Sequence, residues 1–113
     1  METVNNFVTD LIDGMEDHQA NTLIISGGSY PYYLIANKME KLTAFGEIET
    51  AELVEDMEAL GVIIKDDQNL SYPHISDNGE GQKWMLRLHT TFSDRKIPSV
   101  VIRIVPGSIG GKP

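Results

Sequence analysis

The chain has 113 residues, 41% of them hydrophobic and 23% charged, and its net charge is −8. A chain of this length suits one small globular domain, and no apolar run approaches the roughly 18 residues of a bilayer-spanning helix. The absence of cysteine excludes disulfides, thiolate metal sites and thiol nucleophiles, and the acidic balance opposes binding to nucleic-acid phosphates, so we expect no nucleic-acid partner.

The first predicted element is an amphipathic helix near the N-terminus. Thr3 is the expected N-cap, and either Gly14 or the polar residues 18–21 would end the helix. Its apolar side chains recur at helical spacing and predict one buried face. They are Val4, Phe7, Val8, Leu11, Ile12 and Met15.

A β-branched run at residues 22–26 predicts the first strand, which leads into a turn at two glycines. The aromatic and aliphatic residues 30–36 predict a second strand. A tight turn at residues 37–38 would return the chain as a third strand over 39–43. Periodicity leaves one alternative open, in which residues 32–44 form a single helix.

A second helix is predicted to begin at Thr50. This residue can act as the N-cap, Glu52 places negative charge where the helix dipole favours it, and Gly61 is a suitable residue just past the end. The predicted buried positions are Leu53, Val54, Met57 and Leu60.

Three further strands complete the predicted sheet. Residues 62–64 form a short apolar strand, and residues 76–81 are rich in turn formers. Residues 83–90 and 97–105 form two antiparallel strands joined by a loop at 91–96. In the first of these, Trp84, Leu86 and Leu88 alternate with Met85, Arg87 and His89, and in the second, Val100, Ile102 and Ile104 alternate with Val101 and Arg103.

The element order α-β-β-β-α-β-β-β predicts an α+β fold, in which helices pack on a mostly antiparallel sheet. We expect a single domain over residues 1–105. The glycine- and proline-rich residues 106–113 are expected to form a linker.

The basic residues concentrate near the C-terminus. Residues 1–67 carry fourteen acidic and three basic side chains, whereas residues 68–113 carry three acidic and six basic ones, including every arginine. Arg87 and Arg103 fall in adjacent predicted strands among apolar neighbours, and Arg95 falls in the loop between them. A guanidinium in such a strand needs an anionic partner or a path to water. Either a bound anion or an acidic side chain of this chain could be that partner.

The other candidate sites fail on spacing. His18, His74 and His89 share no spacing typical of metal ligands, so no metal site is predicted. Residues 106–113 only superficially match a phosphate-binding loop, because proline stands at both the first glycine position and the final hydroxyl position. The glycines at 27–28 are expected to form a turn. No catalytic residue is predicted in this chain.

Four segments occur in the order expected of a known family. Residues 20–31 are ANTLIISGGSYP, residues 47–54 are EIETAELV, residues 85–90 are MLRLHT and residues 100–106 are VVIRIVP. This series resembles the N-terminal domains of the secretion and pilus traffic ATPases, which include PilT-like retraction motors, PilB- and GspE-like assembly motors and type IV secretion relatives. The resemblance covers nearly the whole chain.

The resemblance implies a PAS-like domain that precedes a RecA-like motor domain in a hexameric ATPase. In that family two arginines reach toward the ATP phosphates held by the motor domain; Arg87 and Arg103 match them here, and Arg95 is a secondary candidate. The full-length protein is expected to use ATP and Mg²⁺, whereas this domain alone is expected to bind neither and to have no ATPase activity. The expected partners are the motor domain, neighbouring subunits and inner-membrane components of a secretion or pilus machine. The expected location is the cytoplasm, at the periphery of the inner membrane.

Two other functions stay open. The chain could be a free-standing acidic adaptor or inhibitor, in which case no phosphate-binding loop would follow it. It could also be a PAS-like sensor of a small molecule, and a ligand that copurifies with it would support that interpretation.

Overall fold

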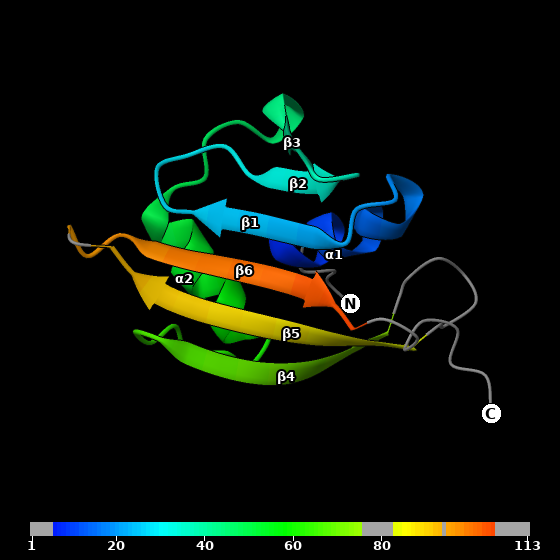
Figure 1. The fold of residues 1–113 in the computed structure, drawn as a ribbon. Helices are drawn as coiled ribbons and strands as arrows, with labels where there is room; N and C mark the ends of the chain where they lie inside the picture. Colours follow the sequence, from blue (N-terminus) through cyan, green and yellow to red (C-terminus); the bar gives the residue numbers. More distant parts are fainter. Residues whose placement is uncertain (1–5, 76–82, 94, 106–113) are drawn as a thin grey trace, which may run out of the picture.

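A six-stranded sheet with both helices on one face makes up the molecule (Figure 1). The computed structural model describes residues 6–75, 83–93 and 95–105. The elements are α1 (Phe7–Asp17), β1 (Thr22–Ser26), β2 (Tyr32–Ile35), β3 (Lys38–Lys41), the 3-10 helix η1 (Thr43–Phe45), α2 (Thr50–Ala59), β4 (Gln68–Ile75), β5 (Lys83–Phe92) and β6 (Pro98–Ile104). The strands lie in the order β3-β2-β1-β6-β5-β4, and every neighbouring pair is antiparallel. The predicted α+β fold is confirmed, and its PAS-like character stays a prediction.

Some predicted features fall outside the described residues. They are Thr3 and Val4 of the first helix, the turn at 76–81 and the linker at 106–113. Within the described ranges, no helix is long and apolar enough to cross a membrane. The short η1 is an element that the sequence pattern did not predict.

Helix α1 begins at Phe7 because side chains from two segments hold its first turn. Asn6 is the N-cap, and its Oδ1 accepts a hydrogen bond from Thr9 N at 3.1 Å. Asp56 of α2 accepts a bond from Phe7 N at 3.0 Å, and its carbonyl oxygen accepts one from Asn6 Nδ2 at 2.9 Å. The N-cap is therefore Asn6 and not the predicted Thr3, because the contact with α2 sets where the helix starts.

Gly14 lies inside α1 and not at its end. Tyr33 of β2 donates a hydrogen bond to Leu11 O at 2.5 Å, and its hydroxyl packs over Gly14. A Cβ at Gly14 would lie 2.6 Å from that hydroxyl oxygen, so the missing side chain makes room for the tyrosine. The helix continues to Asp17. Burial of the ring, together with the negative charges of Asp17 and Asp13, raises the pKa of Tyr33 to about 12.

The segment after β1 is a hairpin, as predicted, and not the alternative helix over 32–44. Strands β2 and β3 pair in antiparallel register, and Ile35 opposite Lys38 closes the hairpin. The turn lies at Ala36 and Asn37, one residue before the predicted turn, with φ angles of +50° and +66°. Two successive positive φ angles are typical of the type I′ turn, whose twist matches that of the flanking strands.

Helix α2 begins at Thr50, one residue after its N-cap. Glu49 holds the extended N-cap conformation and makes no side-chain cap bond, so the cap predicted at Thr50 is wrong by one position. Thr50 instead packs against Gly27, where any Cβ would collide with the threonine hydroxyl. At the other end Gly61 follows the C-cap Leu60 with a φ of +87°, as predicted.

The strand between α2 and β5 lies later in the chain than predicted. The segment at 62–64 is irregular, although two of its side chains, Val62 and Ile64, are buried. Strand β4 instead spans Gln68–Ile75, pairs with β5 and forms one edge of the sheet. Pro73 is tolerated there because an edge strand leaves one side of its backbone without a strand partner.

The hydrophobic core fills the space between the helices and one face of the sheet. It contains Val8, Leu11, Ile12 and Met15 of α1, Leu53 and Met57 of α2, and Leu23, Ile25, Trp84, Leu86, Leu88, Val100 and Ile102 of the strands. Val54 and Leu60, also predicted to be buried, are partly buried at its margin. The alternation predicted in β5 and β6 is confirmed. The other face of the sheet, here called the open face, is covered by neither α1 nor α2 (Figure 1).

Candidate functional site

Two arginines face each other across neighbouring strands on the open face. Arg87 of β5 pairs directly with Arg103 of β6 in the sheet register, and both side chains are exposed. Their orientation follows from alternation, because the flanking Leu86, Leu88 and Ile102 point into the core. Directly opposed residues of an antiparallel pair have Cβ atoms about 5 Å apart, so both guanidinium groups can contact one anion.

A shallow depression of about 550 Å³ surrounds this arginine pair. Its polar lining is Asn69 from β4, Arg87 and His89 from β5, and Arg103 from β6. Its apolar lining includes Val101. The register explains this grouping, because Asn69 lies opposite His89 and His89 lies opposite Val101. Guanidinium, imidazole and amide groups therefore line the depression, and no carboxylate of the described residues does.

Neither arginine is neutralised by a neighbouring acid among the described residues. The ion pairs there are His74–Asp13 and His89–Asp67, and neither includes an arginine. The alternative in which the arginines pair with acids of this chain is therefore wrong for the part of the chain that the structure describes. Like charges directly opposed on a sheet are destabilising, so the arginine pair is not expected to stabilise the strands that carry it.

Arg95 lies apart from the arginine pair. It is exposed in the loop between β5 and β6, beyond the strand pair Phe92 and Pro98. Phe92 is itself five residues along β5 from Arg87, a separation of about 17 Å at strand geometry. The structure therefore brings together two of the three predicted arginine candidates.

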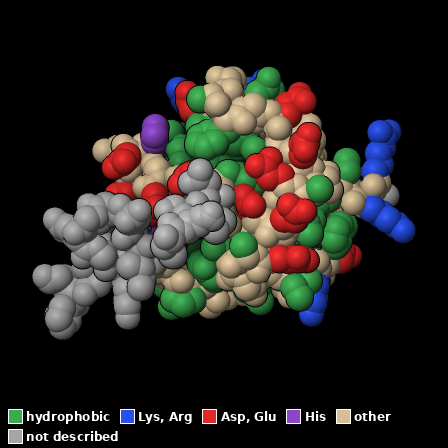
Figure 2. Space-filling view, turned by 180° about the vertical axis from the view of Figure 1, so that it is seen from behind, with side chains coloured by type: hydrophobic (Ala, Val, Ile, Leu, Met, Phe, Trp, Pro, Cys, Tyr) green, Lys and Arg blue, Asp and Glu red, His purple; other side chains and the backbone are tan. Residues whose placement is uncertain are grey.

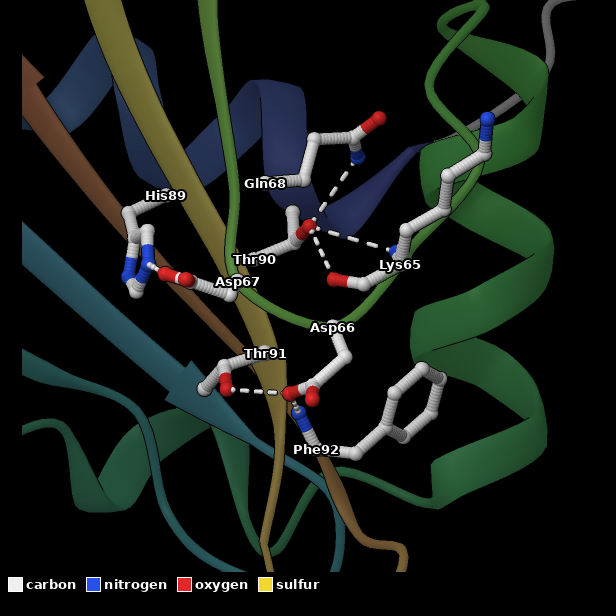
Figure 3. A network of polar contacts seen from close by, with 8 residues as sticks. All are labelled: Lys65, Asp66, Asp67, Gln68, His89, Thr90, Thr91 and Phe92. Atoms are coloured by element: carbon white, nitrogen blue, oxygen red, sulfur yellow. Dashed lines mark hydrogen bonds and ion pairs between the residues drawn. The ribbon is translucent and has the colours of Figure 1, made fainter.

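The loop that leads into β4 is fastened to β5 by hydrogen bonds (Figure 3). Thr90 Oγ1 donates to Lys65 O at 2.7 Å and accepts from Lys65 N at 3.2 Å. Asp66 Oδ1 accepts from Thr91 Oγ1 at 2.9 Å and from Phe92 N at 3.2 Å. These hydrogen bonds hold the pKa of the Asp66 carboxyl below its usual value; the bond from the Phe92 N–H has the largest effect and the bond from the Thr91 hydroxyl the next. This loop therefore has a defined position beside β5.

The same loop places Asp67 next to His89 (Figure 3). Asp67 has a φ of +50°, and its Oδ1 lies 3.2 Å from His89 Nε2. An ionised carboxylate only accepts hydrogen bonds, so Nε2 is the donor in this contact. The His89 side chain stays 40% exposed, at the edge of the depression that holds the arginine pair.

The histidines and glycines considered as other candidate sites make contacts or turns within the fold. Within the described residues, no group of three or more His, Asp or Glu side chains is arranged to hold a metal ion. His74 Nε2 lies 2.7 Å from Asp13 Oδ1, and its ring centre lies 5.5 Å from that of Trp84, so this histidine joins β4 to α1. His18 contacts a carbonyl of α1 through its Nδ1. The glycines at 27–28 form the predicted turn.

The helix side of the molecule carries the opposite charge. Helices α1 and α2 together contain eight acidic residues and no lysine or arginine. Acidic side chains gather on this side, and lysine and arginine side chains lie at its edges (Figure 2). The exposed acids of the two helices are Asp10, Glu16, Asp17, Glu52, Glu55 and Glu58. The sheet therefore separates an acidic helix side from an open face that holds the arginine pair.

Solved structures of larger proteins contain the same fold. The chain is similar to the Legionella pneumophila ATPase DotB, with a TM-score of 0.64 and 11% identity over 94% of this chain and 31% of that chain. It is similar to the Yersinia pseudotuberculosis ATPase DotB, with a TM-score of 0.64 and 16% identity over 92% of this chain and 31% of that chain. It is also similar to the pilus retraction motor PilT, solved with bound ADP, with a TM-score of 0.60 and 11% identity over 88% of this chain and 29% of that chain. No protein-family model and no curated protein matches the sequence.

The structural likeness covers most of this chain but spans only 29–31% of the length of those proteins. At these identities it shows a shared fold. The resemblance to the secretion and pilus ATPases is therefore confirmed at the level of the fold. The shared fold makes up nearly all of this chain and about a third of the DotB or PilT chain.

Sequence reasoning found the two arginines but missed three residues beside them. Alternation along β5 places His89 on the same face as Arg87, and that signal could have added it to the site. Asn69 belongs to β4, a strand that the sequence pattern did not predict. Asp67 reaches His89 through a backbone conformation for which the sequence shows no pattern.

Proposed function

We propose that this chain is the N-terminal domain of a secretion or type IV pilus traffic ATPase and assists ATP binding and hydrolysis by a RecA-like motor domain. The observation that carries this proposal is the directly opposed Arg87–Arg103 pair on the open face, without a carboxylate partner among the described residues. The fold shared with DotB and PilT supports the same assignment. Residues 1–105 would form the domain, and residues 106–113 would begin the connection to the motor domain.

In this proposal Arg87 and Arg103 contact the phosphates of an ATP molecule that the motor domain holds. Guanidinium groups form paired, charge-assisted hydrogen bonds with phosphate oxygens and keep their charge at all physiological pH values. Two such groups stabilise the negative charge on the phosphate oxygens during phosphoryl transfer. ATP supplies the reactive phosphate and Mg²⁺ neutralises part of its charge, and both would be held by the motor domain.

The proposal also assigns partners to the two sides of the molecule. The open face would meet the motor domain with its nucleotide. The acidic helix side suits a basic surface on a neighbouring subunit or on an inner-membrane component of the machine, because complementary charge favours association. The full-length protein would then act as a hexamer in the cytoplasm, at the periphery of the inner membrane.

ATP turnover by the full-length protein tests the role of the arginine pair. Arg87→Gln and Arg103→Gln each remove a charge-assisted contact worth about 1.5–3 kcal/mol, so each should slow turnover about tenfold or more. Arg95→Gln is the matched control, because it removes the same charge from the distant loop and should leave turnover near that of the wild type. Unchanged turnover in both pair variants would overturn the phosphate role.

A second candidate function is a free-standing acidic adaptor or inhibitor, which the eight acidic residues of α1 and α2 favour. The two candidates differ in what the gene encodes after residue 113. A phosphate-binding loop in the same reading frame supports the ATPase domain. A stop codon without such a loop supports the adaptor.

A further inference from the structure

His89 shares the depression of the arginine pair and adds a third group to it. It lies two residues from Arg87 on β5, on the same face of the sheet, and pairs with Val101, two residues from Arg103 on β6. Asn69 pairs with it from the β4 side. A donor at His89 would extend the array of cations by about 7 Å along the strand, which suits a chain of linked phosphates better than a single phosphate.

Asp67 determines which nitrogen of the His89 ring carries a proton. Because Nε2–H donates to the Asp67 carboxylate, the neutral ring has a bare lone pair at Nδ1. No described residue bonds that Nδ1. A bare Nδ1 repels a phosphate oxygen, whereas the imidazolium ring presents Nδ1–H as a donor together with a positive charge. While Nε2–H bonds Asp67, Nδ1 of His89 can therefore donate to a phosphate oxygen only in the protonated ring.

From this geometry we infer that His89 is a third phosphate-binding group of the arginine site, and that its protonation makes the affinity for polyphosphate depend on pH. The inference rests on the phosphate role proposed for Arg87 and Arg103. Asp67 acts as a positioning residue, because it occupies Nε2 and leaves Nδ1 as the ring nitrogen that can meet an anion. Hydrogen bonds of Lys65 and Asp66, in the same loop, to β5 hold Asp67 beside His89.

The charges that face His89 work in opposite directions. On β5 and β6, Arg87 and Arg103 disfavour a further positive charge. In the loop before β4, Asp66 and Asp67 favour it. A bound polyphosphate adds negative charge beside the ring and therefore favours the imidazolium form. By reciprocity, protonation of the ring strengthens polyphosphate binding by the same factor, so binding tightens as the pH falls.

No ATP binding is expected of this domain alone, so titration calorimetry of the chain uses inorganic tripolyphosphate at high concentration, where weak binding to the arginine site is measurable. Measurements at about pH 6 and about pH 8 bracket the range in which histidine ordinarily titrates. The wild type should bind about threefold to tenfold more tightly at the lower pH, as expected for one charge-assisted contact at an exposed site. The ligand itself gains negative charge as the pH rises, which alone would give the opposite trend.

Two variants at one position isolate the histidine. His89→Gln keeps a polar side chain without a titrating charge, so it should bind no more tightly at the lower pH than at the higher one. His89→Lys is positive throughout, so it should bind more tightly than His89→Gln at both pH values. Arg95→Gln is the control for loss of one positive charge at a distance and should keep the pH dependence of the wild type.

The remaining outcomes separate this inference from the proposed function. Weak binding by Arg87→Gln and Arg103→Gln, with the pH dependence unchanged in His89→Gln, would overturn the inference and support the arginine pair. Wild-type binding by both arginine variants would overturn the phosphate role and the inference together. If the wild type shows no binding at either pH, the inference is overturned, and turnover of the full-length protein still decides the proposed function.

Discussion

The two sides of the sheet are built from the same strands and have opposite properties. On the helix side, Leu86 and Ile102 are fully buried against the helices. One residue along each strand, Arg87 and Arg103 are exposed on the open face and face each other without a carboxylate partner among the described residues. Because side chains alternate along a strand, the buried residues on the helix side stabilise the fold and the exposed residues on the open face carry the charge. Substitutions on one side should leave the property of the other side intact.

Both surfaces also carry like charges close together, which does not favour stability. The two helices hold eight acids, several of them three or four residues apart, and the open face holds two opposed arginines. Neighbouring like charges are destabilising in helices and in sheets.

The largest expected effect tests the assignment of stability to the helix side. Ile102→Ala should lower the free energy of unfolding by about 2–5 kcal/mol, because it opens a cavity in the core. Val101→Ala, one residue along and on the open face, should cost no more than about 1 kcal/mol. Urea unfolding followed by circular dichroism measures both. If Ile102→Ala does not fold, Ile102→Val should still cost about 0.5–1.5 kcal/mol. Equal losses at the two positions would contradict the assignment.

The regular alternation of β5 and β6 made these two sides predictable from the sequence. Aliphatic residues at every second position left Arg87 and Arg103 to point away from the core. Their direct opposition was not predictable, because it depends on the register of the hairpin. A slip of one residue would place the two arginines on different faces. The register is set by where the strands end: the sequence pattern predicts a loop over 91–96, whereas β5 continues to Phe92 and β6 begins at Pro98.

Strand β4 escaped prediction because its sequence, QNLSYPHI, has neither a β-branched run nor regular alternation. Pairing with β5 and the hydrogen bonds of Lys65 and Asp66 to β5 determine its position. These are contacts between residues about twenty-five positions apart, which local patterns do not reveal. Asn69 and Asp67 could therefore be placed beside His89 only with the structure in hand.

A smaller effect is expected where β2 meets α1 on the helix side. Tyr33→Phe removes the hydrogen bond to Leu11 O and should cost about 1 kcal/mol at neutral pH. The pKa of Tyr33 is raised to about 12 in the folded chain, against about 10 for an unfolded tyrosine. Its contribution is therefore fully present below about pH 10 and is lost as the pH rises toward 12.

Urea unfolding at neutral pH and at several alkaline pH values measures this contribution. The wild type should lose stability more steeply than Tyr33→Phe above about pH 10. Tyr72→Phe is the matched control, because Tyr72 is only partly buried on the edge strand β4, and its profile should run parallel to that of the wild type. Parallel profiles for the wild type and Tyr33→Phe would contradict the buried, hydrogen-bonded tyrosine.

The acidic helix side should become more stable when its charge is reversed. Glu16 lies in the last turn of α1, where the helix dipole disfavours negative charge, and Asp13 lies three residues before it. Glu16→Lys should raise the free energy of unfolding by about 0.3–1 kcal/mol at low salt, and Glu16→Gln by less. High salt should reduce both gains through screening. A gain that is absent at low salt would show that the acids of this side do not repel one another.

The smallest expected effect concerns the arginine pair itself. Arg103→Thr replaces one of two opposed positive charges by a residue that favours strands, so it should raise the free energy of unfolding by a few tenths of a kcal/mol. Arg95→Thr, in the loop, should leave it unchanged. The same Arg103→Thr variant should lose tripolyphosphate binding, so stability and binding would move in opposite directions at one residue. A loss of stability instead would mean that the aliphatic part of the Arg103 side chain packs on the open face and stabilises it. Arg103 would then contribute to both stability and binding, which would contradict the division of these properties between the two sides of the sheet.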